Sequence, residues 1–206
     1  MTKAREVKDM PLIHTYSHLD QRCHPQRGAS LIMVMLILVV VSLLGVGGAQ
    51  IALMSERGAR NDRDHQVAWQ AAEAALIDAE YELGGPAGSS TRKALFDGVN
   101  VTAFPPGCGT SGTSVGLCTR AAIKPAWLTV DFTVTGSSAA TTEFGAFTGR
   151  TFAAGGVGIQ PAKKPRYIIE AEDDPYFAGK VVYRVTAMGF GPRADIQAML
   201  QVLYRI

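Results

Sequence analysis

An apolar run without a single charged residue, residues 28–55 between Arg27 and Glu56, constrains this chain more than any other feature of its sequence. At about 1.5 Å per residue, a helix over residues 29–54 crosses a hydrocarbon core of about 30 Å with a few residues to spare. The sequence therefore predicts one membrane-compatible helix, and the other segments must be interpreted around it.

Three kinds of N-terminal segment carry such a run. A cleaved secretory signal has a shorter apolar core, of about 7–15 residues, before a small-x-small motif, and residues 47–52 make a poor motif of that kind. A signal anchor keeps the whole segment. In the third case the chain is cut before the core, between Gly28 and Ala29, and the apolar helix stays in the mature protein.

Positive charge is concentrated before the apolar run. Residues 1–28 hold five of the 20 Lys and Arg residues and three of the 18 Asp and Glu residues, so residues 29–206 have fifteen of each sign. The positive-inside rule then predicts a cytoplasmic N-terminus and a periplasmic or exterior C-terminal part. That neutral part gives no electrostatic support for nucleic-acid binding. Both Met1 and Met10 are compatible with the start of the leader.

Two of the three cysteines, Cys108 and Cys118, close a short loop rich in Gly, Ser and Thr, while Cys23 lies in the leader. In an oxidising compartment such a pair is expected to form a disulfide, worth on the order of 3 kcal/mol for a short loop. A reduced or metal-binding pair is the alternative, although the sequence places no other Cys or His nearby to complete a zinc site.

The helical pattern continues beyond the apolar run. Residues 56–83 contain no Pro and one Gly, and alanines recur there every three or four residues. These alanines are Ala68, Ala72, Ala75 and Ala79. Because this spacing repeats one face of a helix, with Glu73 and Glu80 on the opposite face, we expect one continuous helix over residues 29–83. Its length would be about 80 Å, and residues 84–86, Gly-Gly-Pro, would end it.

Beyond residue 126 the sequence changes to a period of two. Residues 127–135, 180–186 and 194–205 alternate in polarity, and residues 166–170 are a shorter example. The pattern predicts an antiparallel sheet with one buried face, with residues 189–192 as the turn between its last two strands. The alanine face can cover this sheet. The expected fold is therefore α+β, a long N-terminal helix packed on an antiparallel sheet head with a disulfide-closed loop.

These features resemble the type IV pilin superfamily. A basic residue, a glycine at the cut and a retained apolar helix are the signature of its prepilin signal. Residues 61–64, 68–76 and 78–80 further resemble the helix of the PilX family of minor pilins, and residues 165–170 and 183–187 resemble its C-terminal sheet. The resemblance covers most of the chain from Arg27 onward and is weakest in the middle loops.

The resemblance implies a processing and assembly pathway. Prepilin peptidase would remove the cytoplasmic leader, residues 1–28, by cutting between Gly28 and Ala29, and would methylate the new amine of Ala29. Residues 29–54 would form the transmembrane and assembly half of the helix, residues 55–83 its amphipathic half, and residues 84–206 the periplasmic or extracellular head. The implied function is a minor pilin that primes type IV pilus assembly at or near the tip and supports adhesin display, adhesion and twitching motility.

The resemblance also implies partners and a location. The partners are other minor pilins, the major pilin, a PilY-type adhesin, prepilin peptidase and the inner-membrane assembly platform. The chain would cross the inner membrane once, with a periplasmic head, and would then enter the pilus at the cell surface. No cofactor or metal is implied. We expect no enzyme, because none of the histidines lies beyond residue 65, where a catalytic triad of the head would need one.

Two other classes stay open. A minor pseudopilin of type II secretion can carry the same signal, although the roughly 120 residues after Leu83 leave little room for the helical insertion of its larger head. A signal-anchored periplasmic protein is the other class.

Met33 departs from the pattern of the superfamily, in which the fifth residue after the cut is normally Glu. A carboxylate in hydrocarbon is costly unless it is paired, and in pilins this Glu is understood to pair with the N-terminal amine of the preceding subunit. Met33 cannot form that pair, and a first subunit has no need of it. The amine of Ala29 can still receive the Glu of the next subunit, so we expect a position at the tip. A tolerated substitution is the alternative.

An acidic cluster precedes Pro175. Its members are Glu170, Glu172, Asp173 and Asp174. Closely spaced oxygen ligands suit calcium, but the regular EF-hand spacing is absent. A solvated turn is therefore the favoured interpretation, with a calcium site as the alternative.

Overall fold

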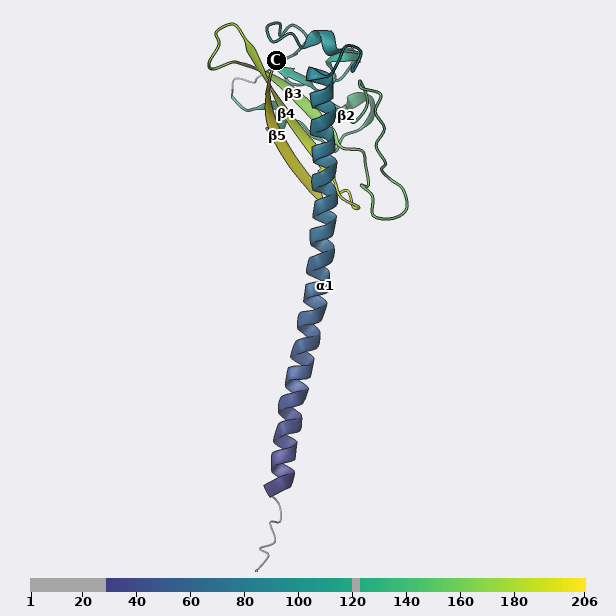
Figure 1. The fold of residues 1–206 in the computed structure, drawn as a ribbon, viewed down its shortest axis with the longest axis vertical. Helices are drawn as coiled ribbons and strands as arrows, with labels where there is room; N and C mark the ends of the chain where they lie inside the picture. Colours follow the sequence, from purple (N-terminus) through teal and green to yellow (C-terminus); the bar gives the residue numbers. More distant parts are fainter. Residues whose placement is uncertain (1–28, 120–122) are drawn as a thin grey trace, which may run out of the picture. The chain divides into compact units, whose positions relative to one another are not determined.

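A computed structural model describes residues 29–119 and 123–206 (Figure 1). The predicted leader, with Gly28, Cys23 and both candidate start residues, lies outside the described residues. The described chain divides after Ala52 into two compact units, of which the second is Leu53–Ile206.

Helix α1 (Ala29–Gly84) runs without a break through 56 residues, which confirms the predicted continuous helix to within one residue of its end. The helix stops where Gly85 donates its N–H to the carbonyl oxygen of Tyr81 at 3.1 Å. A Cβ atom at Gly85 would collide with that same carbonyl oxygen and with Ser89. Glycine therefore permits the close turn at this position, and Pro86 then prevents the helix from resuming.

The later part of α1, from Leu53 onward, belongs to the second unit and buries one face within it. The buried residues of this face are Ala68, Ala71, Ala72, Ala75, Asp78, Ala79, Glu82 and Leu83. Glu73 and Glu80 are exposed, as the sequence pattern predicts. Small side chains on this face let the helix axis approach the sheet closely, and Figure 1 shows this part of α1 lying along β3, β4 and β5.

Three long strands form most of the sheet: β3 (Arg166–Asp173), β4 (Val181–Phe190) and β5 (Gln197–Arg205). They pair antiparallel in sequence order. Two short strands, β1 (Leu117–Thr119) and β2 (Thr142–Glu143), both pair with the other side of β3, β1 parallel and β2 antiparallel. The predicted helix-on-sheet fold is confirmed, and the sheet is mixed because β1 joins it in parallel.

The two faces of the sheet have separate cores. The face toward α1 packs Ala75, Ala79 and Leu83 against Tyr167, Ile169 and other residues of β3 and β4. The opposite face packs Ile168 under Cys118, Ala126 and Phe132 from the connecting loops. Both β3 and β4 are therefore buried on two sides, whereas β5, at the sheet edge, is exposed at every second residue.

One predicted strand is wrong. Residues 127–135 are not a strand. They begin inside a short 3₁₀-helix, η3 (Ala126–Leu128), and continue as turns and irregular chain. Asp131 accepts hydrogen bonds from the backbone N–H and the hydroxyl of Thr133, at 2.7 and 2.6 Å, and such local bonds favour a turn over a sheet ladder. Two of the alternating apolar residues still reach the core, because Val130 and Phe132 pack against Ile168.

Three more 3₁₀-helices lie in the connecting loops: η1 (Lys93–Leu95), η2 (Gly112–Ser114) and η4 (Gly136–Ser138).

Gly189 lies inside β4 and not in the predicted turn at residues 189–192, because the strand continues to Phe190. A Cβ atom at Gly189 would collide with the carbonyl oxygen of Ala68 and the backbone nitrogen of Ala72. The backbone of α1 thus rests directly on the backbone of β4 at this point, and only glycine allows that approach. The connection to β5 is made instead by residues 191–196, where Gly191 donates its N–H to the carbonyl oxygen of Ile196 at 2.7 Å.

Replacing Gly189 by Ala should therefore separate α1 from β4. We expect G189A to lower the free energy of unfolding of the head by about 1–3 kcal/mol, the usual cost of overpacking. Urea unfolding of the full chain in detergent micelles measures this change.

Gly84→Ala is the matched control, because a Cβ atom at Gly84 meets nothing within 4 Å. We expect G84A to leave stability unchanged or to raise it by up to about 1 kcal/mol, since alanine favours helix. Equal effects of the two substitutions would contradict the close contact at Gly189.

Candidate assembly site

The first part of α1 presents an apolar surface on all sides. Its large side chains are all half exposed or more, for example Met33 at 68%, Leu36 at 62% and Leu44 at 69%. Among the described residues, α1 is long and apolar enough to cross a membrane, and its most apolar stretch has a mean hydropathy of 2.8 with no residue buried. An apolar surface of this extent is not stable in water and needs lipid or other apolar helices around it.

One of the two predicted processing residues lies at the start of this helix. Ala29 is the first residue of α1, and Gly28 lies outside the described residues. Met33 follows in the next turn, within a stretch that has no ionisable side chain before Glu56. This part of α1 therefore offers no charged contact, and the fifth position of the predicted mature chain contributes no charge.

At its C-terminal end α1 buries two carboxylates, Asp78 and Glu82, on the alanine face. Buried acids near a helix C-terminus are unfavourable unless cations or hydrogen-bond donors compensate them. The guanidinium of Arg92, also buried, donates both Nε–H and Nη2–H to the Glu82 carboxylate, the latter bond at 3.1 Å. This ion pair fastens the segment after α1 back onto the helix.

Asp78 and Tyr167 extend this buried cluster to the sheet. The Tyr167 hydroxyl donates to Glu82 at 2.8 Å, and the Asp78 carboxylate accepts the backbone N–H of Gly145 at 2.8 Å and the Thr148 hydroxyl at 2.6 Å. Burial and then the two carboxylates raise the pKa of Tyr167 well above its ordinary value, so the hydroxyl stays a donor. One polar cluster therefore joins α1, β3 and the loop after β2.

This cluster was not predicted from the sequence, although a signal was present. Asp78 and Glu82 are four residues apart and fall in the same helical stripe as Ala75 and Ala79. A charged residue on an otherwise apolar helix face indicates a buried partner. The partner itself, Arg92, could not be identified, because it lies beyond the helix in a loop without a regular pattern.

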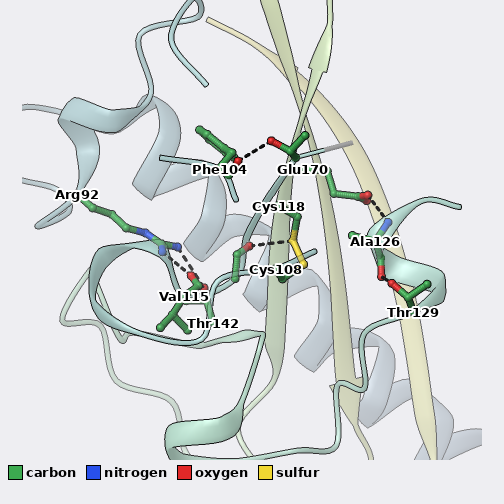
Figure 2. Close-up of a disulfide and its surroundings, with 11 residues drawn as sticks. Arg92, Phe104, Cys108, Val115, Cys118, Ala126, Thr129, Thr142 and Glu170 are labelled. Atoms are coloured by element: carbon green, nitrogen blue, oxygen red, sulfur yellow. Dashed lines mark hydrogen bonds between the residues drawn. A yellow bond between two sulfur atoms is a disulfide. The ribbon is translucent and has the colours of Figure 1, made fainter. Parts of the chain in front are cut away.

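The disulfide between Cys108 and Cys118 is present, as predicted, with the two Cα atoms 4.3 Å apart. It closes the loop that leads into β1, whose Cys118 is buried against β3. Figure 2 shows the bridge between Arg92 on one side and Glu170 with Ala126 on the other. Arg92 Nη1 donates to the carbonyl oxygen of Val115 within the closed loop at 2.5 Å, so the ion pair and the disulfide support the same loop.

The acidic residues before Pro175 do not converge on one point. The buried Glu170 accepts the backbone N–H of Ala126 at 2.6 Å, and burial raises the pKa of its carboxyl. Glu172 pairs with Arg184 at 2.8 Å. Within the described ranges, no group of three or more His, Cys, Asp or Glu side chains is placed to hold a metal ion.

Asp174 belongs to the hairpin tip. Its carboxylate accepts the backbone N–H of Tyr176 at 2.8 Å and pairs with Arg205 at 2.6 Å. Burial alone would raise the pKa of Asp174, but these bonds outweigh it and lower the pKa. Arg205 also lies against the exposed rings of Tyr176 and Phe177, so this carboxylate fixes the tip of the β3–β4 hairpin to the end of β5.

His65 is the single histidine within the described residues, and it lies exposed on α1. The described part of the head places no histidine beside a nucleophile. What the geometry offers is an apolar helix for lateral packing and a sheet head that is held on the later part of α1 by apolar packing and a buried ion pair. This construction, an apolar N-terminal helix whose later part packs on a sheet head, is pilin-like.

The comparisons with known families agree with that class. Residues 27–76 match a family model described as PilX N-terminal, and residues 59–206 match one described as type IV pilus assembly protein PilX C-term. Neither a curated protein nor a solved structure matches the chain. The chain belongs to the PilX family of type IV pilus assembly proteins, and it is a minor pilin whose expected role is structural.

Removing the cation of the buried cluster should cost far more than removing an exposed one. We expect Arg92→Met to lower the free energy of unfolding by about 3–5 kcal/mol, because Glu82 would remain buried without a partner. Urea unfolding of the full chain in detergent measures the loss.

Arg60→Met is the matched control. Arg60 pairs with Glu56 four residues earlier, and both side chains are exposed. Such a pair contributes about 0–1 kcal/mol. A loss below about 1 kcal/mol for Arg92→Met would show that the buried cluster does not hold the head on α1.

Proposed function

We propose that this minor pilin primes type IV pilus assembly and stands at or near the pilus tip, where it supports adhesin display, adhesion and twitching motility. The observation that carries the tip position is Met33, on an apolar helix that has no charge before Glu56. A subunit with subunits ahead of it would gain from a Glu at this position, and the first subunit has no such need.

The proposed maturation begins in the inner membrane. Prepilin peptidase removes residues 1–28 between Gly28 and Ala29 and methylates Ala29, which starts α1. Residues 29–54 then serve as membrane anchor and assembly helix, residues 55–83 as the amphipathic half, and residues 84–206 as a head in the periplasm. The disulfide supports this location, because such bonds persist in oxidising compartments.

The proposed partners follow from two surfaces, the apolar part of α1 and the outside of the head. The apolar part of α1 packs against the helices of the major pilin and of other minor pilins when the inner-membrane assembly platform moves it out of the lipid. The head remains on the outside of the fibre, where it can contact a PilY-type adhesin. A type II secretion pseudopilin is less well supported, because both matching family models describe pilus assembly.

Processing gives the first test. Co-expression with prepilin peptidase should convert the chain to a product whose N-terminus is methylated Ala29, as read by intact-mass spectrometry. Gly28→Phe should block this conversion, because the peptidase must accommodate residue 28 at the cut.

Gly45→Phe serves as its control, since Gly45 lies in the same apolar run and a Cβ atom there meets nothing within 4 Å. This variant should be processed normally. A wild-type product that still begins near Met1 would overturn the prepilin assignment.

Position in the fibre gives the second test. A small tag inserted at the fully exposed Val157 should appear at pilus ends in immunogold images. Met33→Glu should move part of the label into the shaft, because the restored carboxylate can pair with a preceding subunit. Met35→Glu places the same charge at a neighbouring position without that partner and should abolish incorporation. Uniform wild-type labelling along the shaft would refute the tip position and leave the family assignment intact.

A further inference from the structure

Two buried arginines of the head use their hydrogen-bonding capacity differently. A guanidinium has five N–H donors. Arg92 makes five hydrogen bonds, to both Glu82 oxygens, the Thr142 hydroxyl and two loop carbonyls. Arg166 makes three within the described residues: Nε to the Thr141 hydroxyl at 2.6 Å, Nη2 to the Thr141 carbonyl at 2.7 Å and Nη1 to Glu143 at 3.2 Å. Two charged donors of Arg166 therefore remain without a protein acceptor there.

Arg166 lines a hollow of about 480 Å³ on the face of β3 opposite α1. The other lining residues are Thr110, Ser111, Gly112, Val115, Gly136, Ser137, Ala139, Thr141, Glu143 and Ala146. Arg166 and Thr141 are buried, whereas Thr110, Ser111 and Ser137 are exposed. The hollow thus has a cationic base and a rim of small hydroxylated side chains.

The charge of the hollow favours an anion. Glu143 is the single carboxylate that lines it, and its two oxygens are shared between Lys164 at 3.0 Å and Arg166 at 3.2 Å. Lys164 does not itself line the hollow, but it shares the Glu143 carboxylate, so Arg166 is not fully compensated by that acid. Burial lowers the pKa of Arg166, against the attraction of Glu143, as expected for a guanidinium that is incompletely compensated. A ligand carboxylate would accept the free donors in a charge-assisted, forked arrangement.

The rim indicates what carries that carboxylate. The hydroxyls of Thr110, Ser111 and Ser137 form no hydrogen bond to any described residue, so they are available to a polar ligand. No large apolar or aromatic side chain lines the hollow, and its apolar side chains are those of Val115, Ala139 and Ala146. The volume lies in the range of small-molecule sites and suits one or two sugar rings.

The walls of the hollow are held in place by the features already described. Thr110, Ser111 and Val115 belong to the loop closed by the Cys108–Cys118 disulfide. Arg92 donates a hydrogen bond to the carbonyl oxygen of Val115 in this loop (Figure 2). Such a fixed loop presents its hydroxyls without paying an ordering cost on binding.

We propose that this hollow binds an acidic sugar, a uronic or sialic acid residue, with its carboxylate on Arg166 and its hydroxyls on the rim. The site lies on the head and does not depend on the position of the subunit in the fibre.

Titration of the full chain in lipid nanodiscs with sodium D-glucuronate, followed by calorimetry or saturation-transfer NMR, tests the proposal, with D-glucose as the neutral probe. We expect glucuronate to bind at least about tenfold more tightly than glucose, the usual contribution of a charge-assisted pair. Ser137→Trp, at an exposed position, should fill the hollow and abolish binding without affecting the fold.

Glu143→Gln supplies a test of opposite sign. Removing the competing carboxylate should strengthen glucuronate binding by about tenfold, because the Arg166 donors are then free and the local charge is more positive. Asp195→Asn is the control, since it removes an exposed acid paired with Arg193 away from the hollow, and it should change nothing.

Three results would overturn the proposal. Equal affinity for glucuronate and glucose would show that Arg166 does not bind the carboxylate of the sugar. Unchanged binding in Ser137→Trp would place the sugar elsewhere. Preference for N-acetylglutamate over glucuronate would indicate an acidic peptide as the ligand instead.

Discussion

The direct contact between α1 and β4 is the constraint on which the rest of the head depends. At Gly189 the strand backbone touches the helix backbone at Ala68 and Ala72, and a stripe of alanines keeps the two elements close over several turns. So short a separation leaves little space for apolar side chains along the stripe. Near its end the helix is fixed both by the apolar packing of Leu83 and by polar contacts through Asp78, Glu82 and the buried Arg92.

With this arrangement, one part of α1 carries the head and the other part presents an apolar surface. Its later part is fixed to the head by burial and by the ion pair. Its earlier part is apolar on all sides, and no residue of its most apolar stretch is buried. Such a surface can exchange lipid for neighbouring apolar helices at little cost, because both surroundings are equally apolar. Because the chain belongs to the PilX family, we expect this exchange to take place during the assembly of a type IV pilus.

The sequence predicts the long-range periodic features of the fold and misses the contacts that depend on loops. The helix end near Gly84, the alanine face and the three long strands follow from repeats of 3.6 and 2 residues, and the disulfide follows from the loop spacing of Cys108 and Cys118. Residues 127–135 were misleading because a loop that covers a sheet face also buries alternate residues. The ion pair with Arg92 and the hollow at Arg166 bring together distant segments, and no local pattern encodes that.

Photo-crosslinking from the apolar part of α1 tests the central claim most directly. A photoreactive amino acid at Leu36, which is 62% exposed, would be incorporated in cells that make pili, and sheared pili would be separated from membranes before analysis. The structure predicts adducts between this chain and the apolar helix of a second pilin in the sheared pili. Recovery of the chain in the membrane fraction alone, with adducts to lipid and none to a pilin, would contradict the assignment of α1 as an assembly helix.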